Sequence, residues 1–110
     1  MMKGFKIEVD HSSRSNRVIE LADPTWKTLG DEIEGFFEIV RLHHLMPDRV
    51  MVVNDCGAIN DMPLNSVASV IAGQWIYGPA VILREGMTED GPDLISLTDD
   101  DIELMTVLYR

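Results

Sequence analysis

The central part of the chain, residues 50–83, contains no lysine and no arginine, and its only charged residues are Asp55 and Asp61. It opens on the apolar run 50–53 and closes on the apolar run 80–83, with turn residues and a stretch of small residues between them. Apolar, β-branched runs bounded by turn residues are typical of strands. This segment therefore predicts a strand, a tight turn, a short helix and a second strand.

The rest of the chain predicts further strands on either side of this segment. Apolar and polar residues alternate over 5–9, and the ranges 17–21 and 36–42 also have strand composition. With the strands 50–53 and 75–83, and helices after Asp23, after Pro63 and at Thr98, the predicted order is β-β-α-β-β-α-β-α. We expect an α+β domain with one mixed or mostly antiparallel sheet of about five strands and three helices on one side. The other face would then need cover, which a homodimer or another partner would supply.

The helix ends carry recognisable capping residues. Asp23 is placed as an N-cap with proline at the first helical position, and Gly35 as the end of that helix. Asn65 is placed as the cap of the second helix. Thr98 followed three residues later by Asp101 predicts a capping box for the last helix.

Composition restricts the class of protein. The chain has 110 residues, enough for one domain, and a formal net charge of −10. Residues 84–110 hold two arginines against eight acids, a net charge of −6. Direct nucleic-acid binding needs clustered Lys and Arg, so we do not expect it. No apolar run is long enough to span a membrane, and the single cysteine, Cys56, indicates a reducing compartment, so we expect a cytoplasmic protein.

Three motifs of the central segment occur together. They are Asn54-Asp55-x-Gly57, Met62-Pro63-Leu64-Asn65 and Ile76-x-Gly78-x-x-Val81. In this order they resemble the DUF3846 family, small proteins common in phages, plasmids and integrative elements. The family carries no established activity. The resemblance therefore implies a fold for residues 1–110 and a mobile-element setting, but no reaction.

Candidate catalytic and metal-binding residues are few. Cys56 is a nucleophile only with a base nearby, and the adjacent Asp55 would raise its pKa. His43 and His44 are adjacent, which is poor spacing for two ligands of one metal, although His11 could converge on them in the fold. The triad 99–101 is explained by helix capping. We expect no enzyme activity, no cofactor and no metal.

One polar cluster remains, at the start of the second helix. Asn54, Asp55, Asn65 and Gly78 surround this helix start, where free N–H groups favour an anion. These residues could equally serve only the turn, the cap and a bulge. Both interpretations stay open.

Two functions follow as hypotheses. The first is a non-enzymatic accessory protein of a phage or mobile element that binds a basic host or defence protein through an acidic surface. The second is a small-molecule binder with a nucleotide or other anion at the helix after Pro63. The second hypothesis lacks a cation, because residues 50–83 hold no Lys or Arg.

Overall fold

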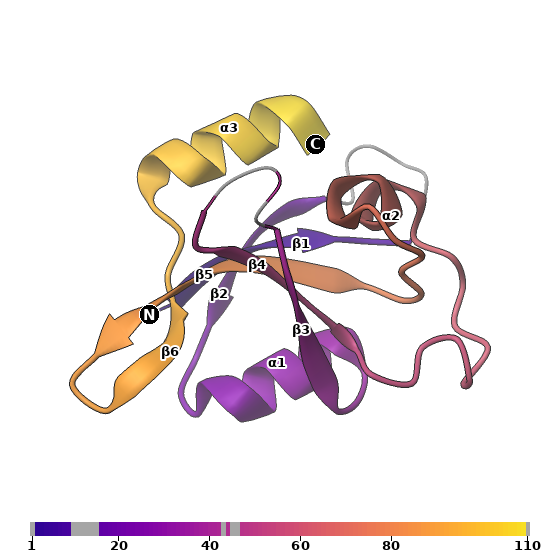
Figure 1. Ribbon diagram of the computed structural model, residues 1–110, viewed down its shortest axis with the longest axis horizontal. Helices are drawn as coiled ribbons and strands as arrows, with labels where there is room; N and C mark the ends of the chain where they lie inside the picture. The colour runs from indigo at the N-terminus through magenta and orange to yellow at the C-terminus, as the bar shows by residue number, and fades with distance from the viewer. Residues whose placement is uncertain (1, 10–15, 43, 45–46, 110) are drawn as a thin grey trace.

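In a computed structural model that describes residues 2–9, 16–42, 44 and 47–109, the chain forms one antiparallel six-stranded sheet and three helices (Figure 1). The elements are β1 (Met2–Ile7), β2 (Arg17–Leu21), α1 (Thr25–Ile33), β3 (Phe37–Arg41), β4 (Arg49–Asn54), α2 (Ser66–Ala72), β5 (Ala80–Thr88), β6 (Gly91–Ile95) and α3 (Asp99–Tyr109). The predicted α+β class is confirmed. No helix of the described residues is long and apolar enough to cross a membrane.

The strands follow the order β2-β1-β5-β4-β3, and β6 pairs with the second half of β5. β5 is therefore central, with β1 on one side and β4 on the other along its first half. β2 and β3 are the two edges of this path. The sequence predicted a mixed or mostly antiparallel sheet. Every strand pairing in the described residues is antiparallel, which confirms the second alternative.

Helices cover both faces of the sheet, so the expectation of helices on one side is wrong. In Figure 1, α1 lies below the sheet and α2 and α3 lie above it. Alternate residues of β5 point to the two layers: Ala80 and Ile82 pack toward α2 and α3, whereas Val81 and Leu83 pack toward α1. The face that the sequence left uncovered is filled by α1, so the reason given above for a homodimer falls away.

β6 is the strand that the sequence did not predict. It forms a hairpin with β5 through Glu89 and Asp90, and its register places Met87 opposite Pro92. β6 pairs with β5 alone, so the other edge of β6 needs no backbone N–H donor. Proline, which has no N–H, is therefore tolerated in this strand. Gly91-Pro92-Asp93 therefore belongs to a strand, although its composition is that of a turn.

Several boundaries differ from those predicted. β5 begins at Ala80, after Gly78 and Pro79, and residues 75–79 form only an isolated bridge between Leu64 and Tyr77. The N-cap of α1 is Pro24, which makes no side-chain capping hydrogen bond, where Asp23 was predicted. The C-cap is Glu34, with a left-handed φ of 66°, one residue before the predicted Gly35.

The caps of the other two helices are confirmed. Asn65 caps α2 by accepting the Ala68 N–H at 3.1 Å. At α3, the Thr98 hydroxyl accepts the Asp101 N–H at 3.1 Å, and the Asp101 carboxylate accepts the Thr98 N–H at 3.0 Å. This reciprocal pair is the predicted capping box.

Asp101 also joins α3 to the sheet. Asp101 as a whole residue is 5 % exposed. Its carboxylate lies 2.7 Å from the guanidinium of Arg49, which is at the start of β4. Burial raises the pKa of Asp101, but hydrogen bonds from Arg49 and from Thr98, with the charge of Arg49, outweigh it and lower the pKa below its usual value. The ionised carboxylate therefore stabilises the folded state.

We expect Asp101→Ala to lower the free energy of unfolding at neutral pH by at least about 2 kcal/mol, because it removes the cap and leaves Arg49 unpaired. A carboxyl whose pKa is lowered on folding contributes stability above its unfolded pKa, and that contribution is lost as the pH falls through the folded pKa. The difference in free energy of unfolding between wild type and variant should therefore become smaller at acidic pH. Urea unfolding at neutral and acidic pH measures both quantities.

Asp100→Ala is the matched control, because Asp100 is exposed in the same helical turn and has only the helix dipole to lose, about 0.3–1 kcal/mol. A gap between wild type and Asp101→Ala that stays constant with pH would contradict the role given to the ionised carboxylate.

Candidate functional site

The predicted site residues lie in the two segments that connect β4 to α2 and α2 to β5. Asn54 ends β4 and Asp55 follows it, while Asn65 precedes α2 and Gly78 precedes β5. Asn65 and Gly78 are in contact, and Asn54 and Asp55 line one shallow hollow that does not include them. The structure thus divides the predicted cluster into two pairs.

The Asn65 side chain is fully buried and makes three hydrogen bonds. Its amide nitrogen donates to the carbonyls of Ile7 and Gly78, both at 3.0 Å, and its oxygen accepts the Ala68 N–H. It joins the end of β1, the start of α2 and the turn before β5. These contacts occupy the side chain inside the protein.

The Asn54 side chain is also engaged within the chain. Its amide nitrogen donates to the carbonyls of Ile33 and Glu34, at 3.2 and 3.3 Å, which are carbonyls at the C-terminal end of α1. Its oxygen accepts the Cys56 N–H at 2.9 Å, an Asx turn. Asn54 therefore closes α1 against the end of β4.

Two glycines are required at this place for different reasons. Gly78 has a φ of 87°, which a side chain rarely tolerates, and its N–H donates to the Pro63 carbonyl at 2.8 Å. Gly57, in the turn after β4, does not have a positive φ. A Cβ at Gly57 would lie 2.5 Å from the Tyr77 carbonyl oxygen, so the close approach of two backbones selects glycine there.

The anion site at the start of α2 stays a prediction. The N–H groups of Ala68 and Ser69 already donate to Asn65, at 3.1 and 2.9 Å. Asp55, the exposed member of the cluster, brings negative charge to the neighbouring turn. Among the described residues, no Lys or Arg lines the hollows beside α2 and the turn after β4, where its side chain could help to hold a phosphate.

Cys56 lies on the turn after β4 and is partly exposed. A hydrogen bond to the Asp55 carboxylate raises its pKa, as do the negative charge of Asp55, some burial and the charge of Glu38. The thiol is therefore protonated at neutral pH and is a weak nucleophile.

The histidines do not form a metal site among the residues that the structure describes. His44 is exposed, and its Nε2 lies 3.0 Å from the Ile71 carbonyl. His11 and His43 lie outside the described residues. Across the described ranges, no group of three or more His, Cys, Asp or Glu side chains is placed to hold a metal ion.

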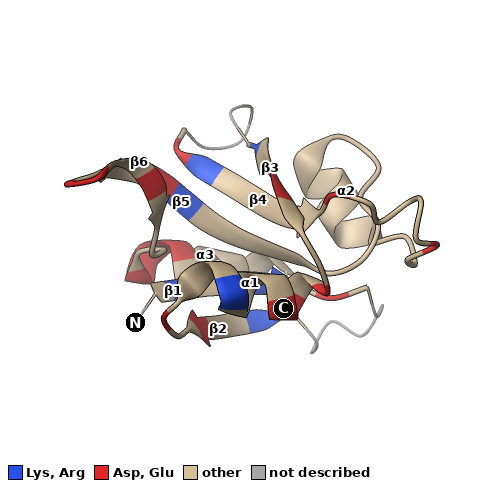
Figure 2. Cartoon of the chain, turned by 90° about the horizontal axis from the view of Figure 1, so that it is seen from below, with Lys and Arg blue, Asp and Glu red and all other residues tan. Residues whose placement is uncertain are grey.

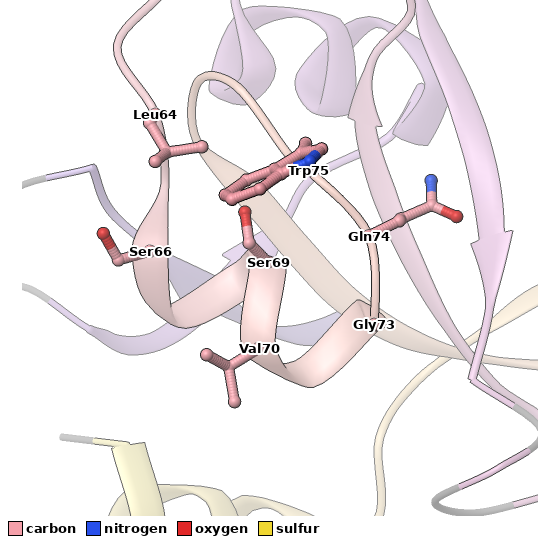
Figure 3. A pocket seen from close by; sticks show the side chains of 7 residues that line it. All are labelled: Leu64, Ser66, Ser69, Val70, Gly73, Gln74 and Trp75. Atoms are coloured by element: carbon pink, nitrogen blue, oxygen red, sulfur yellow. The ribbon is translucent and has the colours of Figure 1, made fainter.

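The large aromatic residue exposed in this region is Trp75, which was predicted to begin a strand. Its side chain is 74 % exposed and forms one wall of a hollow of about 470 Å³ over α2 (Figure 3). The other lining residues are uncharged: Leu64, Ser66, Ser69, Val70, Gly73 and Gln74. In Figure 3 the indole lies above Ser69 and toward Leu64, and Val70 points outward from the helix.

A second hollow, of about 140 Å³, lies beside Trp75 and is acidic. Trp75 and Tyr77 line it together with Glu38 and Asp55. Within the described residues, no Lys or Arg forms an ion pair with either carboxylate. Figure 2 shows the same absence of basic residues over α2 and the segments that flank it.

A sequence signal for Trp75 did exist. Gly73 ends α2 in a left-handed conformation, so the next residues leave the helix on a loop. Loops run over the surface, and a large aromatic side chain placed directly after a helix end is therefore exposed unless a partner covers it. Its apolar character instead suggested a strand beginning at residue 75.

The model of one protein family, described as Domain of unknown function (DUF3846), matches residues 2–110. This match covers nearly the whole chain and confirms the resemblance carried by the three central motifs. No curated protein and no solved structure matches the chain.

We expect Asn65→Ala to lower the free energy of unfolding by about 3 kcal/mol, because the Ile7 and Gly78 carbonyls and the Ala68 N–H would all lose their partner in a dry interior. Asn60→Ala is the control, since Asn60 is exposed on the preceding turn. Urea unfolding compares the two. Equal stability of both variants would show that the buried amide does not hold the three elements together.

We expect Asp55→Asn to speed the alkylation of Cys56 by iodoacetamide. Removing the carboxylate lowers the thiol pKa and so raises the thiolate fraction at a given pH. The pH at which the rate is half-maximal should move down, with a smaller movement in Glu38→Gln. An unchanged pH profile in Asp55→Asn would contradict the cause given for the raised pKa.

Proposed function

We propose that this chain, which belongs to the DUF3846 family of domains of unknown function, acts by binding another protein and not by catalysis. In the mobile-element setting that the family resemblance implies, the partner is a host or defence protein with basic and apolar side chains at its contact surface. The observation that carries this proposal is the exposed Trp75, which stands between an uncharged hollow and an acidic one.

Hydrogen bonds to α2 and to its cap hold the backbone next to Trp75. The Ile76 N–H donates to the Ser69 hydroxyl at 2.8 Å, and the Ile76 carbonyl accepts the Asn65 N–H at 2.8 Å. A fixed, exposed tryptophan loses little conformational freedom when it is covered, and tryptophan is enriched among residues that dominate protein interfaces. Trp75 therefore has the properties of an interface anchor.

The charges beside Trp75 favour a basic partner. Glu38 and Asp55 are exposed, and a Lys or Arg side chain entering between them would gain both carboxylates and the faces of Trp75 and Tyr77. An anion would meet two like charges at the same place. This is the reason that we favour a protein partner over the nucleotide alternative.

Further acids would assist the approach of such a partner. Exposed carboxylates of the β5–β6 hairpin and the first turn of α3 gather at one end of the molecule (Figure 2). They are Glu89, Asp90, Asp93, Asp99 and Asp100. With a net charge of −10, the chain attracts basic surfaces over long range, mainly through the association rate.

What supports a non-catalytic role is the state of Cys56. Its pKa is raised by the same two carboxylates that would receive the partner's cation. A surface that keeps its thiol protonated suits cation binding better than nucleophilic attack.

A peptide array tests this proposal, with the purified protein applied to short peptides that combine Arg or Lys with apolar residues. We expect the wild type to retain basic-apolar peptides and to reject the same peptides with Glu in place of the basic residue. Trp75→Ser should weaken retention at least about tenfold, as loss of an interface anchor does. Glu38→Gln with Asp55→Asn should weaken it and reduce its dependence on salt.

Trp26→Ser is the matched control, because Trp26 is 69 % exposed but lies on α1, far along the chain from this surface. Retention that is equally weak in both tryptophan variants, or no basic peptide retained by the wild type, would contradict the proposal. A nucleotide that raises the melting temperature of the wild type, with no peptide retained, would favour the anion-binding alternative.

A further inference from the structure

β3 has a free edge. It is the last strand of the order β2-β1-β5-β4-β3 and pairs with β4 alone. In an antiparallel pair, alternate residues of a strand turn their N–H and C=O groups toward the partner. The Leu42 N–H donates to Arg49 at 2.9 Å, and the Asp55 N–H donates to Phe36 at 3.1 Å. Residues 36, 38, 40 and 42 therefore face β4.

It follows that Phe37, Ile39 and Arg41 direct their backbone N–H and C=O groups away from β4 and out of the sheet. The side chains of Phe37 and Ile39 pack on the α1 face, where each is half-buried. Native proteins protect such edges with lysine, proline, bulges or a covering element. β3 reads FEIVR, and its register with β4 runs from Phe37 to Arg41 without a bulge, so it carries none of the first three devices.

Exposed aromatic side chains lie next to this edge. Phe36 is 85 % exposed and Trp26 is 69 % exposed. They line a hollow of about 720 Å³ together with Phe37, and Trp26 lines another, of about 450 Å³, with Phe37 and Ile39. Large aromatic residues are enriched in protein interfaces, and contiguous exposed apolar side chains mark interaction sites. The edge and its aromatic flank therefore form one continuous surface suited to a partner strand.

We propose that β3 pairs with β3 of a second copy of this chain, so that two six-stranded sheets join into one. This surface is centred on the edge of β3 and shares Glu38 with the acidic hollow beside Trp75. The inference does not depend on the proposed function. A two-fold axis at Ile39 places Ile39 opposite its own copy and Phe37 opposite Arg41. Because these are the residues whose backbone groups point outward, every facing pair can exchange hydrogen bonds.

The choice of a second copy, over a foreign strand, rests on this self-complementarity. In this register Ile39 faces Ile39, Phe37 faces Arg41 and Glu38 faces Val40. No two like charges stand directly opposite each other. Arg41 is already paired with Glu85 at 3.0 Å, so the edge brings no unpaired cation into the interface. The net charge of each copy opposes association, so added salt should strengthen the dimer.

Sedimentation velocity over a range of concentrations tests the proposal on the whole chain. We expect a monomer–dimer equilibrium with a dissociation constant below about 1 mM that tightens with salt. Ile39→Pro removes an outward N–H but no hydrogen bond to β4, and should abolish the dimer. Trp26→Ser with Phe36→Ser changes only exposed side chains and should weaken the dimer at least about tenfold. Trp75→Ser should leave it unchanged.

Amide hydrogen exchange by NMR identifies the interface without any substitution. The N–H groups of Phe37, Ile39 and Arg41 should exchange more slowly as the concentration rises, while those of Glu38 and Val40 are protected at every concentration. A monomer at all concentrations up to about 1 mM overturns the proposal. A dimer that leaves the N–H groups of Phe37, Ile39 and Arg41 unprotected also overturns the proposal. Occupation of the β3 edge by a foreign peptide in place of a second copy would overturn it as well.

Discussion

β4 and β5 lie side by side in the middle of the sheet, and both faces of their paired stretch are buried. Val52 faces Val81 toward α1, and Met51 faces Ile82 toward α2 and α3. A charge at any of these positions would be buried without water, which costs several kcal/mol unless it is paired. This constraint accounts for the absence of Lys and Arg from the strand residues 50–53 and 80–83, and the other elements are arranged around this pair.

The connections around this strand pair are held by buried amides. Asn65 ties β1 to the start of α2 and to the turn before β5, and Asn54 ties the end of α1 to the end of β4. Among the described residues, every buried side-chain nitrogen and oxygen has a hydrogen-bond partner. Asn54 and Asn65 of the central motifs are thus part of the interior. The groups left for a ligand or partner are exposed ones, above all Trp75 and the carboxylates beside it.

The two exposed tryptophans mark two different surfaces. Trp75 follows α2 and borders an uncharged hollow and an acidic one, whereas Trp26 lies on α1 beside the free edge of β3. A basic partner at Trp75 and a second copy at β3 would respond to salt in opposite directions, because the first joins unlike charges and the second joins two acidic chains. The two surfaces are compatible with one assembly, in which each copy of a dimer presents its own Trp75.

The sequence by itself determined the α+β class, the two apolar strands, the caps of α2 and α3 and the family, because these depend on local chemistry: apolar runs, capping side chains and short motifs. Only the tertiary structure decided that helices cover both faces, that Gly91-Pro92-Asp93 pairs within β6, and that Asn54 and Asn65 face inward. Gly57 shows the reason: its need for glycine comes from the Tyr77 carbonyl, twenty residues away in the chain. Contacts between distant segments leave no local pattern, so the free edge of β3 could not be read from the residues alone.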